Sequence, residues 1–367
     1  MKQTRIVTYV LALAVTVMML NAQARRGAGP AGGAAKIEHI VVHGKALEGN
    51  LEGDSPDREV TVYLPPTYQG DQARRYPVVY LLHGFGSRDD AFTGKLVDLT
   101  PSADRLASTG GFSAPIIVIP NASTLHGGSM YSNSVTTGNW ETFVAEDLVA
   151  YIDGHYRTIA VRISRGLAGY GMGGYGALRI GMKRPDVFSS LYVMSAELLD
   201  PNDNARPDTA ALAEAIKTRA QAEQAARAED GRTAGFGASL MLAKAAAWSP
   251  NAGNAPLYLD LPFKDGKLQA DIAARWTTNA GLTMVEGNTS NLKKLYAMVI
   301  DVGTNDPLLA SNRQLHQALM RLEVPHHYEE YEGDHTNRLA DRIDRNFLPF
   351  FSKSLAAPAN PTSPQVQ

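Results

Sequence analysis

A glycine-rich turn lies near the middle of the chain, at Gly169-Tyr170-Gly171-Met172-Gly173. A strand is expected before it, over residues 165–168, and a helix after it, over residues 174–184. In this strand–turn–helix context the pattern G-x-S-x-G lifts a nucleophilic serine above a sheet on a sharp turn with positive φ. The outer glycines, Gly169 and Gly173, let the strand and helix backbones approach closely. The central position holds Gly171, which has no side chain to act as a nucleophile.

Two later loops carry an acid and a base. Asp306 follows an apolar run, residues 295–302, and His335 follows a short strand expected over residues 328–331. The chain order of Gly171, Asp306 and His335 is the order nucleophile, acid, histidine found in one class of serine hydrolases. Because a histidine oriented by an aspartate can act as a general base, these positions predict acyl-transfer chemistry.

Other residues could serve as the acid or the base in place of Asp306 and His335. Asp301 is an alternative acid, but it lies at the end of its strand, where a structural role is expected. His326 and His327 are alternative bases, but they stand at the start of a strand and are expected at the surface.

Apolar runs alternate with helical segments along most of the chain. Strands are predicted over residues 36–42, 59–63, 76–82, 115–119, 165–168, 191–194, 295–302 and 328–331, and helices over 140–156, 174–184 and 312–322. A continuous apolar run such as 76–82 is typical of a central strand covered on both faces. The alternation predicts an α/β fold with a mostly parallel sheet, whose ligand site lies at the carboxyl ends of the strands.

Residues 199–293 interrupt this alternation. Residues 203–232 are rich in Ala, Glu, Gln and Arg and predict one or two surface helices, whereas the stretch to residue 289 mixes Pro, Gly and aromatic residues. We interpret 199–293 as a cap-like insertion over the strand ends, within one domain that spans residues 36–355. The alternative is a long helical crossover that does not touch the site.

These motifs together resemble the esterase D-like α/β-hydrolases, which include S-formylglutathione hydrolases, feruloyl esterases, enterobactin-type esterases and mycolyltransferases. The resemblance spans most of residues 37–352. It rests on the glycine-rich turn and on the segments Gly49-Asn50-Leu51, Tyr63-Leu64-Pro65-Pro66-Thr67-Tyr68, Leu81-Leu82-His83-Gly84-Phe85-Gly86 and 147–156. It implies the α/β-hydrolase fold, with Asp306 as the acid of a G-x-x-D motif and His335 as the base of a G-x-H motif.

The resemblance also implies the rest of the site. The backbone N–H groups of Phe85 and Met172 would form the oxyanion hole, which stabilises a tetrahedral intermediate by several kcal/mol. The expected substrate-binding residues are His83, Gly84, Tyr170, Ser132 in the loop 127–134, and Trp276 in the cap. For Tyr170 and Trp276, simple packing is the alternative.

Gly171 leaves the activity open, because an acyl-enzyme cannot form without a nucleophilic oxygen. One explanation is a pseudo-hydrolase that binds a ligand, glycan or protein partner without turnover. Another is a water molecule deprotonated by His335 and oriented through Asp306. A third is a serine borrowed from the loop 127–134, and a fourth is a variant in which an original serine was replaced by Gly171. The retained acid and base favour the water and variant explanations over decay.

Composition excludes several other classes of function. The net charge of −2 provides no basic surface for nucleic acid, and the absence of cysteine excludes disulfides and thiolate metal sites. No metal and no cofactor are predicted, because no cluster has zinc-like spacing and the glycines of an apparent G-x-G-x-x-G belong to the turn at 169–173. The expected partner is a small-molecule ester or acyl substrate, and the oligomeric state is not predicted.

The N-terminus is typical of a signal peptide. Lys2 and Arg5 precede an apolar run over residues 6–20, followed by Ala22-Gln23-Ala24, an A-x-A cleavage pattern. The run is short for a membrane span, which needs about 20 residues. We therefore expect residues 1–24 to be removed and the protein to be secreted or periplasmic, with an uncleaved anchor as the alternative. A flexible leader at 25–35 and a disordered tail at 356–367 are also predicted.

Overall fold

The computed structural model describes residues 35–108, 114–200, 207–227 and 234–356. The expected signal peptide, most of the leader and most of the tail therefore lie outside the described residues. Within those four ranges, no helix combines the length and apolar character that crossing a membrane requires.

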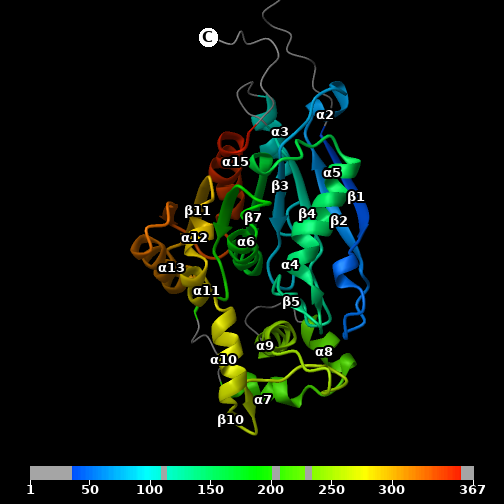
Figure 1. The fold of residues 1–367 in the computed structure, drawn as a ribbon, viewed down its shortest axis with the longest axis vertical. Helices are drawn as coiled ribbons and strands as arrows, with labels where there is room; N and C mark the ends of the chain where they lie inside the picture. The colour runs from blue at the N-terminus through cyan, green and yellow to red at the C-terminus, as the bar shows by residue number, and fades with distance from the viewer. Residues whose placement is uncertain (1–34, 109–113, 201–206, 228–233, 357–367) are drawn as a thin grey trace, which may run out of the picture.

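An eight-stranded sheet forms the centre of the molecule (Figure 1). Its first three strands in spatial order pair antiparallel, and the remaining ones pair parallel. In spatial order the strands are β1 (Lys36–His43), β2 (Asp57–Leu64), β4 (Ile116–Pro120), β3 (Val78–Leu82), β7 (Arg165–Tyr170), β8 (Ser190–Met194), β11 (Ala297–Gly303) and β12 (His327–Tyr331). The predicted mostly parallel α/β sheet is confirmed.

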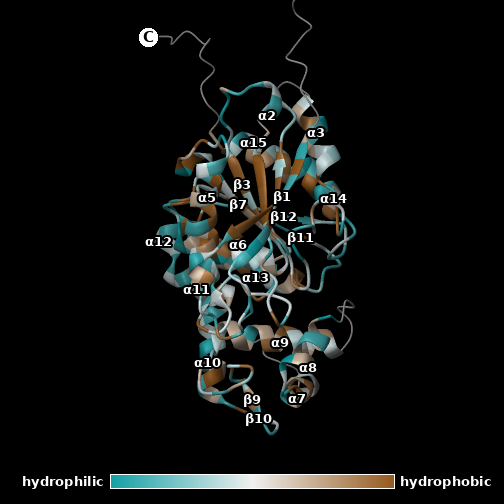
Figure 2. Cartoon of the chain, turned by 90° about the vertical axis from the view of Figure 1, so that its right-hand side faces the viewer, coloured by the Kyte–Doolittle hydropathy of each residue, from teal (hydrophilic) through white to brown (hydrophobic). Residues whose placement is uncertain are grey.

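The central strands are apolar on both faces because helices cover both sides of the sheet. Val78, Tyr80 and Leu82 of β3 belong to one buried cluster, and Val79 and Leu81 belong to the other. This division follows from the alternation of side chains along a strand. Figure 2 shows these strands as the brown, hydrophobic centre of the molecule.

Two layers of helices enclose the sheet. One face packs against α4 (Trp140–Thr142), a π-helical turn (Phe143–Asp147), α5 (Leu148–His155), α6 (Met172–Lys183) and α13 (Leu309–Arg321). The other face packs against α3 (Thr100–Ser108), α14 (Leu339–Arg342), a second π-helical turn (Ile343–Phe347) and α15 (Leu348–Ser354). The short helix α2 (Thr67–Gly70) follows β2. The helix expected over 140–156 is thus interrupted by a π turn.

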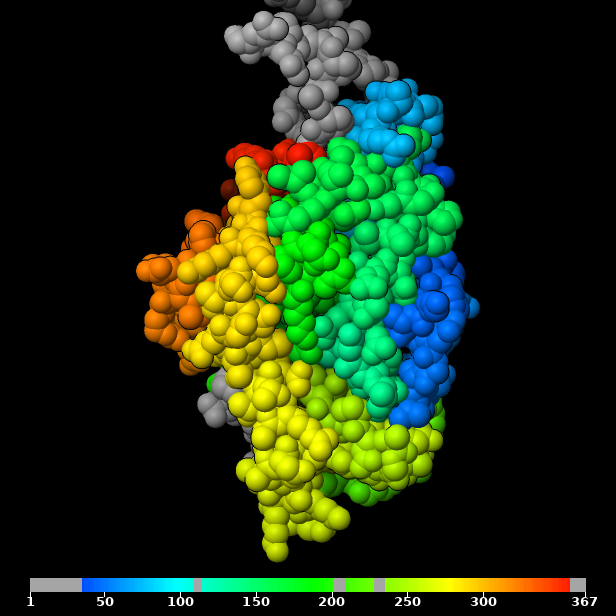
Figure 3. All heavy atoms as spheres, viewed as in Figure 1, coloured from blue at the N-terminus to red at the C-terminus, as the bar shows by residue number. Residues whose placement is uncertain are grey.

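Most of the described segment between β8 and β11 forms a separate layer at the end of the molecule opposite α2 and α3 (Figures 1 and 3). It contains α7 (Pro207–Ala215), α8 (Arg219–Ala226), α9 (Ala234–Trp248), the hairpin β9 (Phe263–Lys264) and β10 (Lys267–Leu268), and α10 (Ala270–Asn279). Two short helices, α11 (Gly281–Gly287) and α12 (Thr289–Leu292), then return the chain to α6. We refer to residues 207–279 as the cap.

The cap rests on the loop that follows β4. The Ser239 hydroxyl donates to the carbonyl of His126 at 2.7 Å, and the Ser134 hydroxyl donates to the carbonyl of Ala246 at 2.6 Å. Because the loop follows the carboxyl end of a parallel strand, the cap lies on the side of the sheet where ligands bind in such folds.

Candidate active site

The turn between β7 and α6 has the geometry of a nucleophile elbow. Gly171 has φ 59° and ψ −119°, a conformation that side chains rarely adopt. A Cβ on Gly169 would lie 2.0 Å from the carbonyl oxygen of Gly173, and a Cβ on Gly173 would lie 2.0 Å from that of Leu82. The outer glycines are therefore required by close backbone contact. The central residue is constrained by its backbone conformation rather than by space.

Asp306 and His335 meet beside this turn. His335 Nδ1 lies 2.9 Å from Asp306 Oδ2, and the Asp306 side chain is fully buried. The Leu308 N–H donates to the other carboxylate oxygen at 2.8 Å. The Tyr170 hydroxyl donates to the carbonyl of His335 at 2.7 Å, and its ring packs against the imidazole with centroids 4.7 Å apart. The imidazole is therefore oriented both by an aspartate and by an aromatic ring.

The charge around His335 is negative. Burial disfavours the imidazolium, but the hydrogen bond and charge of Asp306, together with the charges of Glu197 and Asp334, outweigh it and raise the pKa of His335 above its usual value. Burial, followed by the charge of Glu197, also raises the pKa of Tyr170, so its phenol remains a neutral donor at physiological pH. Acids from three separate loops thus act on one histidine.

His335 and Glu197 both border the volume that a side chain at position 171 would fill. A Cβ added to Gly171 would lie 3.6 Å from His335 Nε2 and 3.6 Å from Glu197 Oε1. These are ordinary van der Waals distances, so a small side chain fits there. The sequence did not single out Glu197. Its one signal is its place, three residues beyond the carboxyl end of β8, which is the next strand in the sheet after β7.

The two expected oxyanion donors follow β3 and β7, which are neighbours in the sheet. Met172 is the first residue of α6, and N–H groups at a helix start have no acceptor within the helix. Phe85 lies in the turn after β3, where the Gly86 N–H donates to the carbonyl of Gly127 at 3.1 Å. The Phe85 ring packs edge-on against Phe236 of the cap helix α9, with centroids 5.2 Å apart. The cap thus covers the turn that carries one donor.

His83 supports this turn from inside the core. Its Nε2 accepts from the Ala122 N–H at 2.9 Å, and its Nδ1 lies 2.9 Å from the carbonyl of Gly84. These bonds fix a neutral tautomer, and complete burial lowers the pKa of His83 to about 4. A Cβ on Gly84 would lie 3.4 Å from the carbonyl of Tyr170, so this glycine packs against the elbow strand. His83 and Gly84 therefore position the turn.

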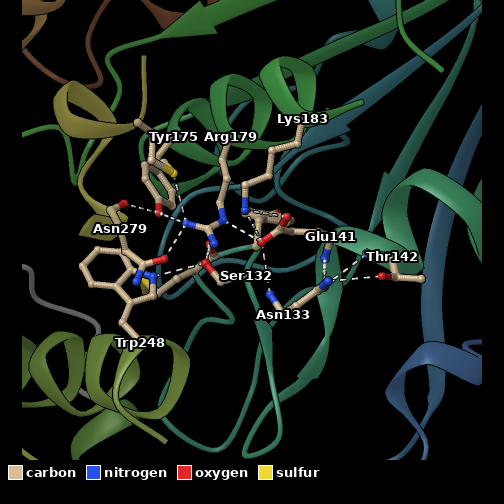
Figure 4. Close-up of polar contacts among 12 residues, drawn as sticks. Ser132, Asn133, Glu141, Thr142, Tyr175, Arg179, Lys183, Trp248 and Asn279 are labelled. Atoms are coloured by element: carbon tan, nitrogen blue, oxygen red, sulfur yellow. Dashed lines mark hydrogen bonds and ion pairs between the residues drawn. The ribbon is translucent and has the colours of Figure 1, made fainter. Parts of the chain in front are cut away.

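The other two expected substrate-binding residues, Ser132 beneath the cap and Trp276 within it, form buried hydrogen bonds. The Ser132 hydroxyl donates to the carbonyl of Met130 at 2.8 Å and accepts from the Trp248 indole N–H at 3.1 Å (Figure 4). Trp276 is 2% exposed, and its indole N–H donates to the Ser249 hydroxyl at 2.9 Å. Ser132 thus connects the loop after β4 to α9, and Trp276 connects α10 to the residue that follows α9.

The competing residues lie elsewhere. Asp301 accepts from the Tyr192 hydroxyl at 2.7 Å and from Arg342 Nε at 2.9 Å, within the core. His326 Nε2 lies 2.9 Å from His316 Nδ1, and exposed His327 begins β12, at the end of the strand away from Asp306. None of them contacts the Asp306–His335 pair in the described contacts.

A cavity of about 680 Å³ borders the Phe85 turn through Gly86 and Gly127. Its walls carry charges of both signs, from Asp54, Arg58, Glu59, Arg88, Arg219, Glu223 and Arg227. Gly171, Asp306 and His335 are not among its lining residues, so the cavity adjoins the Phe85 turn and not the acid–base pair. In the described ranges, no three His, Asp or Glu side chains are grouped so as to hold a metal ion.

Comparison with known proteins identifies the family. The Esterase family model matches residues 55–339. Esterase Rv1288 of Mycobacterium tuberculosis is 38% identical over 135 residues, which cover 36% of this chain and 27% of the relative. An endo-1,4-beta-xylanase/feruloyl esterase of Xylanibacter ruminicola is 28% identical over 171 residues, covering 44% of this chain and 23% of the relative. The chain thus matches about a quarter of the length of these curated relatives.

Solved structures show the same fold. A ferulic acid esterase superposes with a TM-score of 0.61 and 23% identity over 88% of this chain and 100% of that chain. An S-formylglutathione hydrolase of Staphylococcus aureus superposes with a TM-score of 0.56 and 15% identity over 87% of this chain and 100% of that chain. The family match covers more than half of the chain, and the sheet has the strand order and direction described above. The chain therefore belongs to the esterase family and has the α/β-hydrolase fold.

Proposed function

We propose that the protein hydrolyses a small-molecule carboxylic ester with a water molecule that His335 activates. The observation that carries this proposal is the position of His335 Nε2, which lies 3.6 Å from the place of a Cβ on Gly171 while Nδ1 is held by buried Asp306. The imidazole is thus aimed at the volume in which a serine hydroxyl would stand. A water molecule in that volume has a base within reach and needs only a small polar site.

The reaction is a single displacement. His335 Nε2 takes a proton from the water as its oxygen forms a bond to the ester carbonyl carbon. The carbonyl oxygen becomes an oxyanion that accepts from the N–H groups of Phe85 and Met172. The bond to the leaving oxygen then breaks, His335 returns the proton to that oxygen, and an acid and an alcohol are released. Asp306 orients the imidazole and stabilises its charged form.

The test is hydrolysis of a chromogenic short-chain ester by the unsubstituted chain and by His335→Ala. We expect slow turnover by the chain and a loss of about 10²- to 10⁴-fold in His335→Ala, the usual contribution of a general base. The control is His327→Ala, which removes an exposed histidine at the start of β12. Equal rates in the chain and in His335→Ala, or no hydrolysis by the chain, would contradict the proposal, and the latter would favour a binding role.

We also propose that the protein is exported. The support is the charged start, the apolar run over residues 6–20 and the A-x-A pattern ending at Ala24. N-terminal sequencing of the exported chain is expected to begin at Arg25, and a chain that still begins at Met1 would contradict cleavage.

A further inference from the structure

Glu197 lies beside position 171 but has no role in the ester-hydrolysis mechanism described above. Its Oε1 lies as close to the place of a Cβ on Gly171 as His335 Nε2 does, at 3.6 Å, and its carboxyl carbon lies 3.7 Å from the same point. The carboxylate and the imidazole therefore border one atom-sized volume and are at most twice that distance apart. Among described residues other than the chain neighbours of Gly171, no atom approaches the point more closely.

The backbone around Glu197 is fixed by bonds to three separate elements. The Ser195 N–H donates to the carbonyl of Asp301 at 2.8 Å, and Ala196 exchanges two hydrogen bonds with the Asn312 side chain. The Glu197 N–H donates to the carbonyl of Gly171 itself at 3.2 Å. The backbone of Glu197 is thus hydrogen-bonded directly to the turn that its carboxylate faces.

The same segment is strained. Ser195 and Leu198, on either side of Ala196 and Glu197, have φ values of 43° and 58°, in the left-handed region that non-glycine residues avoid. Each such residue costs about 1–3 kcal/mol and persists only where its surroundings impose it. Strain of this kind is concentrated at functional sites, and here it accompanies a carboxylate placed among the acids that already surround His335.

We propose, on the basis of the ester-hydrolysis function above, that Glu197 is a catalytic residue that holds the attacking water against His335. The water donates one hydrogen bond to Glu197 Oε1 and the other to His335 Nε2, which leaves a lone pair of its oxygen for the ester carbonyl. In the reaction the proton passes to His335, while Glu197 keeps its hydrogen bond to the attacking oxygen. No bond to Glu197 forms or breaks.

A covalent role for Glu197 fits the site less well. A carboxylate that attacked the ester would release the alcohol and form a mixed anhydride, which water would then hydrolyse. A carboxylate has no proton to give up in that attack, so His335 and Asp306 would have no base function in the first step. The geometry therefore favours Glu197 as an acceptor for water.

The first experiment compares the chain with Glu197→Gln, Glu197→Asp and Glu332→Gln in ester hydrolysis across pH. Glu197→Gln keeps the shape of the side chain but removes its charge, and we expect kcat/KM to fall by about 10- to 100-fold. The limb of the profile that reports His335 should also move to lower pH, because one of the charges that raise its pKa is lost. Asp334, Asp306 and Tyr170, which also face His335, are unchanged in this variant.

The other two variants separate charge from position. Glu197→Asp withdraws the carboxylate but keeps its charge, so kcat/KM should fall while the limb of the pH profile stays near its original place. Glu332→Gln removes a charge from an exposed residue in the His335 loop and should alter neither quantity. A role of Glu197 in folding alone would lower stability without moving the limb.

The outcomes separate this proposal from the underlying function. If His335→Ala loses activity but Glu197→Gln matches the chain in rate and in pH profile, the role of Glu197 is wrong and ester hydrolysis stands. If His335→Ala has no effect or the chain has no activity, both are wrong. An acyl group found on the Glu197 peptide by mass spectrometry after acid quenching would make Glu197 the nucleophile and overturn the role stated here.

Discussion

At the scale of single residues, Gly171 relieves backbone strain and leaves position 171 without a side chain that could act as a nucleophile. A glycine adopts φ 59° without the steric cost that a Cβ brings, whereas a serine held there stores about 1–3 kcal/mol of strain. The hydroxyl that such a serine would supply is the group that allows an acyl-enzyme to form. Glycine at this position therefore favours the stability of the fold, whereas serine would favour covalent catalysis.

The substitution Gly171→Ser should show both effects. A seryl side chain fits, since the nearest side-chain atoms lie 3.6 Å from its Cβ, and its oxygen would be within reach of His335. We expect esterase activity to rise by about 10²-fold or more, with a burst of product, and the free energy of unfolding to fall by about 1–3 kcal/mol. Pre-steady-state kinetics and chemical denaturation measure the two quantities. Gly171→Ala is the control, because it adds the strain without the hydroxyl.

If Gly171→Ser shows no gain over Gly171→Ala, the oxyanion hole or the acid–base pair is not competent. A gain without loss of stability would mean that the elbow does not strain a side chain.

At this scale, the order of motifs along the chain indicated that Gly171, Asp306 and His335 would lie together, but it gave no indication of Glu197. Gly171, Asp306 and His335 come together as their chain order indicated, because each follows a strand whose carboxyl end meets the same edge of the sheet. Glu197 follows such a strand as well, but in the string Ser195-Ala196-Glu197 nothing marks a carboxylate as functional. Its direction depends on the backbone of residues 195–198, which local sequence does not encode.

At the scale of elements, a buried polar network joins helix α6 to the cap (Figure 4). Arg179 donates to Glu141 Oε1 at 2.8 Å, to the Tyr175 hydroxyl at 2.8 Å and to Asn279 Oδ1 at 2.9 Å. Lys183 donates to the same carboxylate at 2.9 Å. Although burial works against the charged form of Glu141, Arg179 and Lys183 outweigh it and lower the pKa of this carboxyl. The network connects the helix that begins at Met172 to the last residue of α10.

Removing the arginine should loosen this junction. Arg179→Ala leaves the Tyr175 phenol and the Asn279 amide without their shared partner and the Glu141 carboxylate with Lys183 alone, and we expect a loss of about 2–3 kcal/mol in the free energy of unfolding. Cleavage of the cap in limited proteolysis should also become faster. Arg184→Ala is the matched control: this arginine contacts the exposed Glu146 and Asp186 from the end of the same helix, so about 1 kcal/mol or less is expected. Similar losses in the two variants would contradict a role of the network in holding the cap.

Within the cap, the one or two helices predicted over residues 203–232 correspond to α7 and α8, whereas α9 was not predicted. The core strands are apolar runs bounded by turns, and they lie within two residues of their predicted ends. The segment that forms α9, in contrast, carries apolar residues on all sides and begins among Gly235 and Gly237, so it has no helical period to detect. It is a helix because it is buried between the rest of the cap and the loop after β4, which is a tertiary effect.

At the scale of the whole molecule, buried neutral histidines tie stability to pH. Burial lowers the pKa of His83 to about 4, and it also lowers the pKa of His126, whose Nε2 lies 3.4 Å from the buried Glu52 carboxylate. Because both folded-state values lie below the usual 6.5, the stability they contribute is complete above pH 6.5 and is lost as the pH falls toward the folded-state values. Glu52, whose pKa burial raises, acts in the opposite direction, since its contribution is lost as the pH rises.

The variant His83→Asn isolates one of these groups. From pH 7 to pH 5 the chain should lose about 2 kcal/mol more stability than the variant does, since only the chain must keep this imidazole neutral while the unfolded state binds a proton. The variant should be less stable than the chain at pH 7, because the Ala122 N–H loses its acceptor. Urea denaturation at several pH values measures both. Equal pH dependence in the two proteins would mean that His83 is not held neutral.

The glycine at the elbow also determines which covalent inhibitors can react at this site. Organophosphates and sulfonyl fluorides inactivate serine hydrolases by bonding to the oxygen of the nucleophile, and position 171 offers no oxygen. An esterase that works through water at this turn has no such target. Such an esterase would still hydrolyse esters in a mixture whose serine hydrolases had been inhibited. It would not be labelled by activity-based probes that react with a nucleophilic serine.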